Sequence, residues 1–315
     1  MSTEGGTKAV VAALLANTGI AVMKFLAFLL TGASSMLAEG IHSVVDTGNG
    51  LMMLLGVHNS KKPPDEEHPF GHGRELYFWS LVVAFSIFGI GGGVSIYEGI
   101  THILHPEQIQ NPVWNYAVLG LSFIFEGTTW YFGWLAFSKM RRGRSIIEAM
   151  QESKDPTSFT VVLEDSTALI GLVIAFFGVL LGHEFNMPYF DGAASVLIGV
   201  LLCCVALFLG AESRSLLIGE AVSKEALNAI REIAESDPNV EKALKILSIY
   251  VGPEDVAVTL ELKFKKDVTA VQLRHAVRRI ERAIREKYPR IKNVFYEAES
   301  LSEKDHEAKA SAVTN

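Results

Sequence analysis

The sequence predicts an α-helical membrane domain with six transmembrane spans, followed by a smaller cytoplasmic α+β domain. The chain of 315 residues is 49% hydrophobic and has a mean hydropathy of +0.27, yet 20% of its residues are charged. These values are compatible because residues 8–218 hold long apolar runs, whereas the remainder is mostly polar. We therefore expect a transport-type membrane domain over residues 1–218, a cytoplasmic domain over 219–300 and a disordered tail over 301–315.

The predicted spans are the segments that contain the ~20 apolar residues needed to cross a bilayer. They are residues 8–31, 33–57, 76–100, 113–137, 157–181 and 191–213. Lys and Arg gather in the connectors on one side, whereas the connectors on the other side hold Glu107, Glu184 and Asp191 and no Lys or Arg, so both termini are expected in the cytoplasm. Asp191 at the start of the last span is expected to cap that helix. The glycines at 91–93 allow close contact between helices.

The polar C-terminal part predicts an αββαβ order of elements. Residues 223–236 and 269–288 have helical periodicity, whereas residues 243–251, 256–264 and 291–297 are rich in strand-forming residues. A turn at Gly252-Pro253 joins the first two strands. We expect a helix-backed antiparallel sheet.

Polar residues inside two of the spans indicate a cation site. His42, Asp46 and Asn49 lie at i, i+4 and i+7 of the second span and therefore share one helix face. The fifth span carries Glu164 and Asp165. Ionisable residues within a membrane are costly and usually functional, and imidazole with carboxylates suits Zn²⁺, Fe²⁺, Co²⁺ or Mn²⁺. The alternative is that these groups only join helices by hydrogen bonds, which is a costly use of three acids and a histidine.

Three segments resemble the cation diffusion facilitator family. They are AEGIHSVVDTGNGLMMLLG at 38–56, HPFGHGRELYFW at 68–79 and LEDSTALIGLVIA at 163–175. The resemblance covers nearly the whole chain. It implies a dimeric transporter that exchanges cytoplasmic metal for external protons through a tetrahedral site on spans 2 and 5. It also implies a metallochaperone-like cytoplasmic domain that helps the protein to dimerise.

The resemblance assigns metal ligands residue by residue. His42 and Asp46 match the pair on span 2, and Asp165 matches the second member of the pair on span 5. The first member, four residues earlier, is Val161 in this chain. Glu164 is the best candidate to replace it, and Asn49 is a weaker one. Without a second histidine, the ligand set shifts towards oxygen, and the assignment of Zn²⁺ is less secure than for a site with two histidines.

Two further regions carry expectations from the same resemblance. In the loop after span 2, Asp65, His68 and His72 match a second metal site, although an acidic loop that is simply solvated would also explain them. The cytoplasmic domain has no cysteine and few histidines, so it is expected to dimerise with weak or no metal sensing. Glu126 in span 4 is expected either to relay protons or to pair with Lys24 or Arg74.

The sequence therefore predicts a homodimeric antiporter that exports a divalent transition metal, with protons as the counter-ion and no prosthetic group. Zn²⁺ is the first choice and Mn²⁺ the second, ahead of Fe²⁺ and Co²⁺. A prokaryotic inner membrane is the expected location. The net charge of −7 argues against a nucleic-acid partner. The alternatives are a transport-inactive scaffold subunit, suggested by Val161, and a proton-coupled carrier of another solute. An intramembrane metalloenzyme is disfavoured because His-Glu-x-x-His is absent.

Overall fold

The computed structural model describes residues 3–106, 111–141 and 154–298. The basic connector at 142–153 and the expected disordered tail lie outside these residues. The chain divides into two compact units. The first holds residues 1–62 and 74–217 and is called the membrane unit, after the domain predicted for most of these residues. The second holds residues 63–73 and 218–315 and is called the cytoplasmic unit, after the predicted C-terminal domain.

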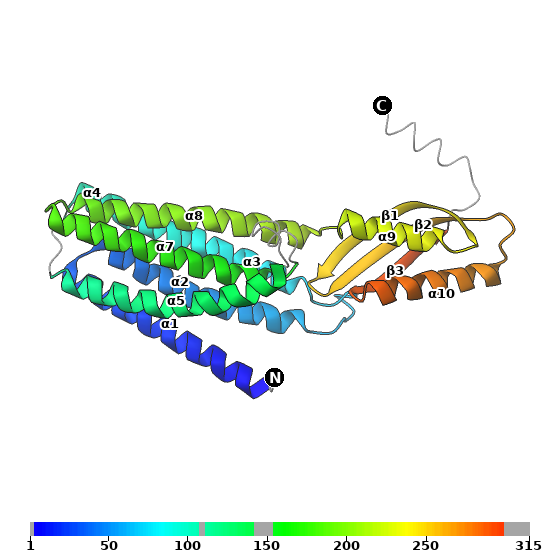
Figure 1. The fold of residues 1–315 in the computed structure, drawn as a ribbon, viewed down its shortest axis with the longest axis horizontal. Coiled ribbons are helices and arrows are strands. Elements are labelled where there is room, and N and C mark those ends of the chain that lie inside the picture. The colour runs from blue at the N-terminus through cyan, green and yellow to red at the C-terminus, as the bar shows by residue number, and fades with distance from the viewer. Residues whose placement is uncertain (1–2, 107–110, 142–153, 299–315) are drawn as a thin grey trace, which may run out of the picture. The chain divides into compact units, whose positions relative to one another are not determined.

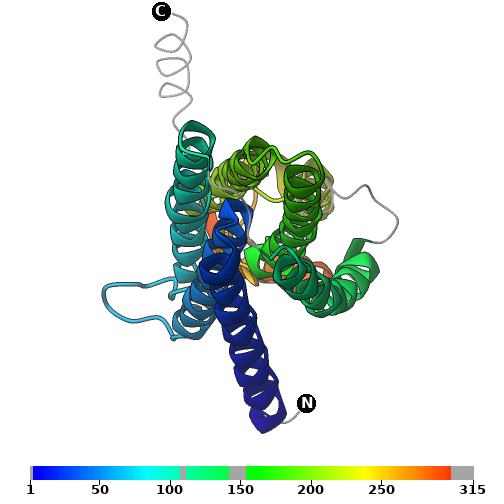
Figure 2. The same cartoon turned by 90° about the vertical axis from the view of Figure 1, so that its left-hand side faces the viewer.

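The membrane unit is built from long helices that run side by side (Figures 1 and 2). They are α1 (Thr3–Thr31), α2 (Ser34–Ser60), the consecutive α3 (Glu75–Ser86), η1 (Ile87–Val94) and α4 (Ser95–Leu104), then α5 (Val113–Arg141), α7 (Pro156–Glu184) and α8 (Tyr189–Ile218). Each segment predicted as a span is helical. By length and composition, three described helices can cross a membrane: Glu75–Leu104, Phe159–Glu184 and Tyr189–Ile218, with Asn17–Thr31 as a shorter apolar helix. The count of six spans stays a prediction.

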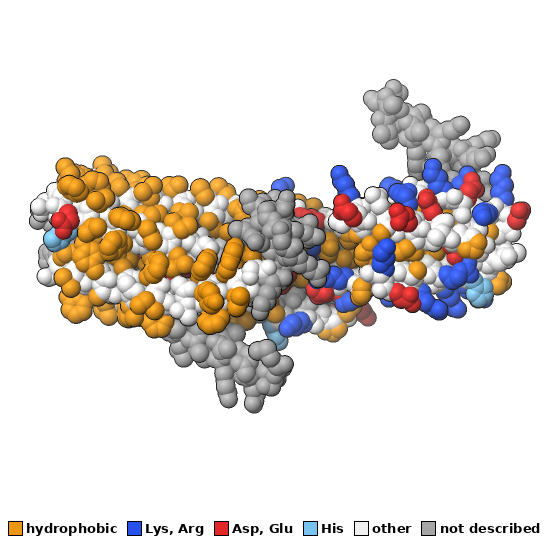
Figure 3. All heavy atoms as spheres, viewed as in Figure 1, with side chains coloured by type: hydrophobic (Ala, Val, Ile, Leu, Met, Phe, Trp, Pro, Cys, Tyr) orange, Lys and Arg blue, Asp and Glu red, His pale blue; other side chains and the backbone are white. Residues whose placement is uncertain are grey.

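Helix α2 is at the centre of the membrane unit, in contact with α1, α3, α4 and α7. Its apolar residues Met36, Val45 and Met53 belong to the buried core of this unit. Large apolar side chains such as Phe85 and Ile124 are exposed on the outside of the unit, and Figure 3 shows how hydrophobic side chains cover that surface. A surface of this kind fits a lipid environment, and it leaves the polar face of α2 enclosed by neighbouring helices.

Glycines bring the α3–η1–α4 segment against α8. A Cβ atom on Gly99 would lie 2.6 Å from the carbonyl oxygen of Gly192, and one on Gly92 would lie 3.0 Å from that of Gly199. Only residues without a side chain allow the two backbones to approach so closely. The close contact predicted for the glycines at 91–93 is therefore confirmed at Gly92, within the π-helical turns of η1.

Asp191 caps the N-terminus of α2, although it lies in α8. Its carboxylate accepts the backbone N–H of Ser34 at 2.5 Å and that of Ser35 at 3.3 Å, and also the hydroxyl groups of both serines. These serines begin α2, whose own N-cap residue, Ala33, has no side-chain acceptor. The first N–H groups of a helix need partners from outside it. The prediction that Asp191 caps its own helix was therefore wrong, because α2 takes its cap from α8.

The cytoplasmic unit has the predicted αββαβ order, but its sheet is mixed rather than antiparallel. The elements are α9 (Lys224–Glu235), β1 (Val240–Gly252), β2 (Asp255–Phe264), α10 (Ala270–Lys287) and β3 (Ile291–Ala298). The sheet order is β1-β2-β3, in which β2 pairs antiparallel with β1 and parallel with β3. The hairpin turn makes the first pair antiparallel, whereas the α10 crossover returns the chain in the direction of β2. The helices and sheet enclose a core that includes Ile230, Leu260 and Ile284.

Asp237, two residues after the end of α9, ties this helix to α10 through an ion pair. Arg279 donates two hydrogen bonds to the carboxylate of Asp237, at 2.8 and 3.0 Å, and the backbone N–H of Asn239 donates a third at 3.0 Å. Burial alone raises the pKa of Asp237, but the hydrogen bonds from Arg279 and Asn239 outweigh it and leave the pKa below its ordinary value.

We expect Asp237→Asn to lower the free energy of unfolding by about 1 kcal/mol at neutral pH, since Arg279 is half-exposed and solvent screens the pair. Because the folded pKa is depressed, the stabilisation is present above the unfolded value of about 3.9 and is lost as the pH falls through the folded value. Unfolding of the two proteins in denaturant at neutral and acid pH measures the difference, which should shrink in acid. Asp267→Asn, at an exposed position of the same unit, is the control. A difference that does not change with pH would contradict the ion-pair explanation.

Candidate functional site

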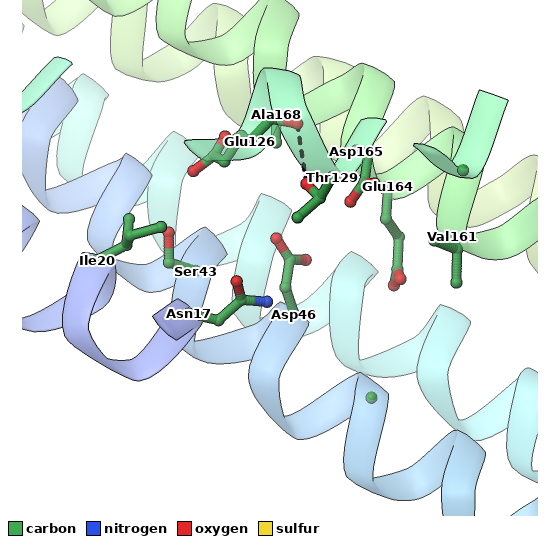
Figure 4. Close-up of a pocket in the computed structure, with 12 residues that line it drawn as sticks. Asn17, Ile20, Ser43, Asp46, Glu126, Thr129, Val161, Glu164, Asp165 and Ala168 are labelled. Carbon is green, nitrogen blue, oxygen red and sulfur yellow. Dashed lines mark hydrogen bonds between the residues drawn. The ribbon is translucent and has the colours of Figure 1, made fainter. Parts of the chain in front are cut away.

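The membrane unit contains a cavity of about 290 Å³ among helices α1, α2, α5 and α7. Its polar lining brings together residues that are far apart in the sequence (Figure 4). The lining residues are Asn17, Ile20, Ser43, Asp46, Gly50, Glu126, Thr129, Gly133, Val161, Glu164, Asp165 and Ala168. Three of the sequence-predicted ligands, Asp46, Glu164 and Asp165, therefore share one cavity.

Asp46 on α2 and Asp165 on α7 point towards each other across this cavity (Figure 4). His42 is one helical turn before Asp46 and is almost completely buried, but it does not line the cavity. Its Nδ1 atom lies 3.4 Å from Oδ1 of Asp46. Neither ring nitrogen of His42 nor Oδ1 of Asp46 has a hydrogen-bond partner among the described residues. Buried polar atoms are normally satisfied, so these atoms remain available to a ligand.

Glu164 is hydrogen-bonded to Asn49, the weaker of the two candidates for the fourth ligand. The amide nitrogen of Asn49 on α2 donates a 2.8 Å hydrogen bond to Oε1 of Glu164 on α7. Asn49 is buried and outside the cavity lining, whereas Glu164 is part of it. In this arrangement Asn49 orients Glu164. Val161, where the family pattern has a ligand, contributes an apolar side chain to the same lining.

The cavity carboxylates surround a space without converging on one point. Within the described part of the chain, only Asp65, His68 and His72 place three ligand atoms within 4.8 Å of one another. Asp46, Glu164 and Asp165 would have to move closer together to coordinate one ion.

The loop cluster has the geometry of a preformed site. The His68 Nδ1 atom lies 3.3 Å from Oδ1 of Asp65, and the His72 Nε2 atom lies 3.4 Å from Oδ2. Nδ1 of His72 is 3.2 Å from the carbonyl oxygen of Pro63 and donates to it, which leaves Nε2 as the free ligand atom. The backbone N–H of His68 donates to Asp65 and lowers the pKa of that carboxyl below its ordinary value. The hydrogen bond from His68 therefore favours the ionised form of Asp65.

This loop belongs to the cytoplasmic unit rather than to the helices that it connects. The ring of Phe70 meets the ring of Phe295 on β3 edge to face, with 6.1 Å between centroids. A Cβ atom on Gly73 would lie 2.7 Å from the Cα atom of Gly252, at the end of β1. These contacts fix the segment that carries Asp65, His68 and His72 to the three-stranded sheet.

Glu126 forms an ion pair with a buried lysine next to the cavity. The ammonium group of Lys24 on α1 lies 2.8 Å from Oε1 of Glu126 and 2.9 Å from Oε2 of Glu39. The prediction that Glu126 pairs with Lys24 is therefore confirmed. Sequence reasoning missed Glu39, although it is an ionisable residue within an apolar span and the rule that identified Asp46 would have found it. Ser43 and Thr129 were also missed, because single hydroxyl groups are common in membrane helices.

Comparison with known proteins matches both parts of the chain to cation efflux proteins. Residues 10–218 match the cation efflux transmembrane domain, and residues 222–300 match the cytoplasmic domain of cation efflux proteins. The chain is 33% identical over 266 residues to the human mitochondrial proton-coupled zinc antiporter SLC30A9, which covers 83% of this chain and 46% of that protein. It is 27% identical over 284 residues to the cation-efflux pump FieF of Cronobacter sakazakii, covering 90% and 89% of the two chains.

The C-terminal part also resembles a solved structure, the nickel form of a MamM CTD variant. The identity is 24% and the TM-score 0.24, over 25% of this chain and all of the other. The chain spans about half the length of the curated zinc antiporters that it matches, and most of the length of FieF. Because the matched models cover both of its units, this chain belongs to the cation efflux family.

Proposed function

We propose that this protein exports a divalent transition metal from the cytoplasm in exchange for protons, with Zn²⁺ as the preferred ion and Mn²⁺, Fe²⁺ and Co²⁺ as the alternatives. The observation that carries the proposal is the cavity among α1, α2, α5 and α7, where Asp46 from α2 and Glu164 and Asp165 from α7 line the same space. Carboxylates bind either a divalent cation or protons, so one displaces the other. The names of the relatives, a zinc antiporter and a cation-efflux pump, support the same reaction.

In this proposal His42, Asp46, Asp165 and Glu164 form the ligand set, and Asn49 orients Glu164. Metal enters from the cytoplasmic side and draws the carboxylates of α2 and α7 towards it. A movement of the helices then exposes the cavity to the other side, where protons compete for the same oxygen and nitrogen atoms and release the metal. The unpartnered nitrogens of His42 and Oδ1 of Asp46 are the atoms whose binding capacity the metal would satisfy.

Metal uptake into proteoliposomes under an imposed pH gradient tests this function. Zn²⁺, Mn²⁺, Fe²⁺ and Co²⁺ are offered in turn, with and without the gradient, to the wild type and to Asp165→Ala. We expect flux of one of these metals that depends on the gradient and is lost in the variant. The absence of flux of any metal from folded protein would contradict the proposal and favour the transport-inactive scaffold, and flux that ignores the gradient would contradict proton exchange.

We further propose that the protein is a homodimer in a membrane, with the cytoplasmic unit contributing to the dimer contact and both termini in the cytoplasm. The prokaryotic inner membrane stays a proposal, because the relatives include mitochondrial and bacterial proteins. Light scattering of the detergent-purified protein measures the mass of the complex, and a monomer would contradict the dimer.

The loop cluster is proposed as a second metal site. We expect Asp65→Ala or His72→Ala to remove one bound Zn²⁺ per chain, because each contributes a ligand atom to a group that lies within 4.8 Å. Glu66→Ala is the matched control, since this neighbouring exposed acid is not part of the group. Metal content after equilibrium dialysis is the measurement. An unchanged metal content in both ligand variants would show that the loop is only solvated.

A further inference from the structure

Lys24 is a buried cation in the C-terminal half of α1. Its side chain is fully buried, and no other lysine or arginine in the described part of the chain is buried to this degree. The Nζ atom donates to Oε2 of Glu39 at 2.9 Å, to Oγ of Ser43 at 2.9 Å and to Oε1 of Glu126 at 2.8 Å. An ammonium group has three protons to donate, so these partners use all of them. A charge that is buried so deeply persists only when it is paired and hydrogen-bonded.

The partners of Lys24 differ in their relation to the cavity. Ser43 and Glu126 line it, whereas Glu39 does not. The second carboxylate oxygen of Glu126, Oε2, is buried and has no partner among the described residues. Glu39 is held between helices, because its Oε1 would lie only 2.4 Å from a Cβ atom on Gly171 of α7. Lys24 therefore pairs with one carboxylate of the cavity and with one that belongs to the helix contact.

We propose that Lys24 is a positioning residue for transport: its ammonium group occupies the place of a cation at Glu126 and keeps this carboxylate out of the ligand set of the metal. The inference rests on the proposed function, since it concerns the metal that the cavity carries. It assigns different tasks to the four acids of the cavity. Asp46, Glu164 and Asp165 receive the metal, and Glu126 is already occupied.

The reason lies in the charge that a transported ion meets. The cavity is lined by four carboxylates, and Lys24 neutralises one of them without leaving the protein. If Glu126 were free, a divalent ion would meet one more negative charge, would bind more tightly and would leave more slowly. A transport site must bind its ion strongly enough to load it and weakly enough to release it. Lys24 thus lowers the affinity of the cavity and favours turnover.

The two carboxylates that Lys24 contacts provide a matched pair of tests. Lys24→Met alone leaves Glu39 and Glu126 unpaired. The double variant Lys24→Met/Glu126→Gln removes the unpaired charge at the cavity, and Lys24→Met/Glu39→Gln removes it at the helix contact. Both double variants restore the same net charge, so they correct the charge imbalance of the fold equally. They differ in whether a free carboxylate faces the cavity.

Zn²⁺ transport by these variants in proteoliposomes separates an effect of Lys24 on the cavity from a purely structural role. For Lys24→Met and for Lys24→Met/Glu39→Gln we expect the KM and the maximal rate to fall about tenfold, because an unscreened charge acts on the bound ion. For Lys24→Met/Glu126→Gln we expect the KM to return towards the wild-type value. If the two double variants have the same KM, Lys24 has only a structural role and the proposal is overturned. The same holds if the KM and maximal rate of each variant change only in parallel with its thermal stability.

A binding measurement keeps the test independent of transport. The rise in unfolding temperature caused by Zn²⁺ in detergent should be larger for Lys24→Met/Glu39→Gln than for the wild type or for Lys24→Met/Glu126→Gln. Wild-type protein that transports no metal would contradict the proposed function, whereas equal Zn²⁺ stabilisation of both double variants would contradict the role of Lys24. The second result can be obtained whether or not flux is observed.

Discussion

Asp46→Ala is expected to reduce metal flux at least about 100-fold, because even the outer partners of metal ligands commonly contribute 10–100-fold to affinity or activity. Asp46 lines the cavity, points towards Asp165 across it and lies 3.4 Å from the buried ring of His42. Its removal takes away a proposed ligand and the carboxylate that lies beside this ring. Uptake into proteoliposomes under a pH gradient measures the loss.

We expect Asp46→Ala to lose metal flux without losing stability. Oδ1 of Asp46 is buried and has no hydrogen-bond partner within the part of the chain that the structure describes. Removing an unsatisfied polar group does not destabilise a fold in the way that removing a satisfied one does. We expect the unfolding temperature of Asp46→Ala to equal or exceed that of the wild type. Thr47→Ala is the matched control, since its hydroxyl donates to the carbonyl oxygen of Ser43 in the same helix. Normal flux in Asp46→Ala would show that the metal binds elsewhere.

Asp191→Ala is expected to produce the largest loss of stability, about 3 kcal/mol. The variant removes the cap of α2, typically about 1 kcal/mol, and also leaves the hydroxyl groups of Ser34 and Ser35 without their charged acceptor. Nδ1 of His102 lies 3.7 Å from the same carboxylate, so the loss reaches α4 as well. Unfolding in detergent, followed by circular dichroism, measures the change.

A pair of milder variants checks the cause. Asp191→Asn keeps one acceptor oxygen for the N-terminus of α2 and should lose less than half as much stability as Asp191→Ala. Ser34→Ala removes one hydroxyl but keeps the backbone N–H that donates to Asp191 at 2.5 Å, and should lose about 1 kcal/mol. If Asp191→Ala is as stable as the wild type, the cap does not hold α2 in place.

Much of this protein is determined by patterns that are local in the sequence. The length of the apolar runs predicts where the helices α1 to α5, α7 and α8 lie, and the alternation from Val256 to Phe264 predicts β2. The spacing of His42 and Asp46 places both on one face of α2. These features follow from helix and strand periodicity, so they could be read without knowing any contact between distant residues. The family resemblance was readable from the same segments, and the match over residues 10–218 and 222–300 confirms it.

Only the tertiary structure decided which distant groups meet. Asp191 lies 157 positions from Ser34 and Glu126 lies 102 positions from Lys24, and no periodic pattern records such pairs. The same holds for Asn49 and Glu164, for the parallel pairing of β3 and for the attachment of the 63–73 loop to the sheet. Propensity and periodicity act over a few residues, whereas burial of charge and satisfaction of hydrogen bonds act between whichever helices pack together. The sequence therefore determined the elements and several polar residues of the site, and packing determined which of these residues face the cavity and which are already paired.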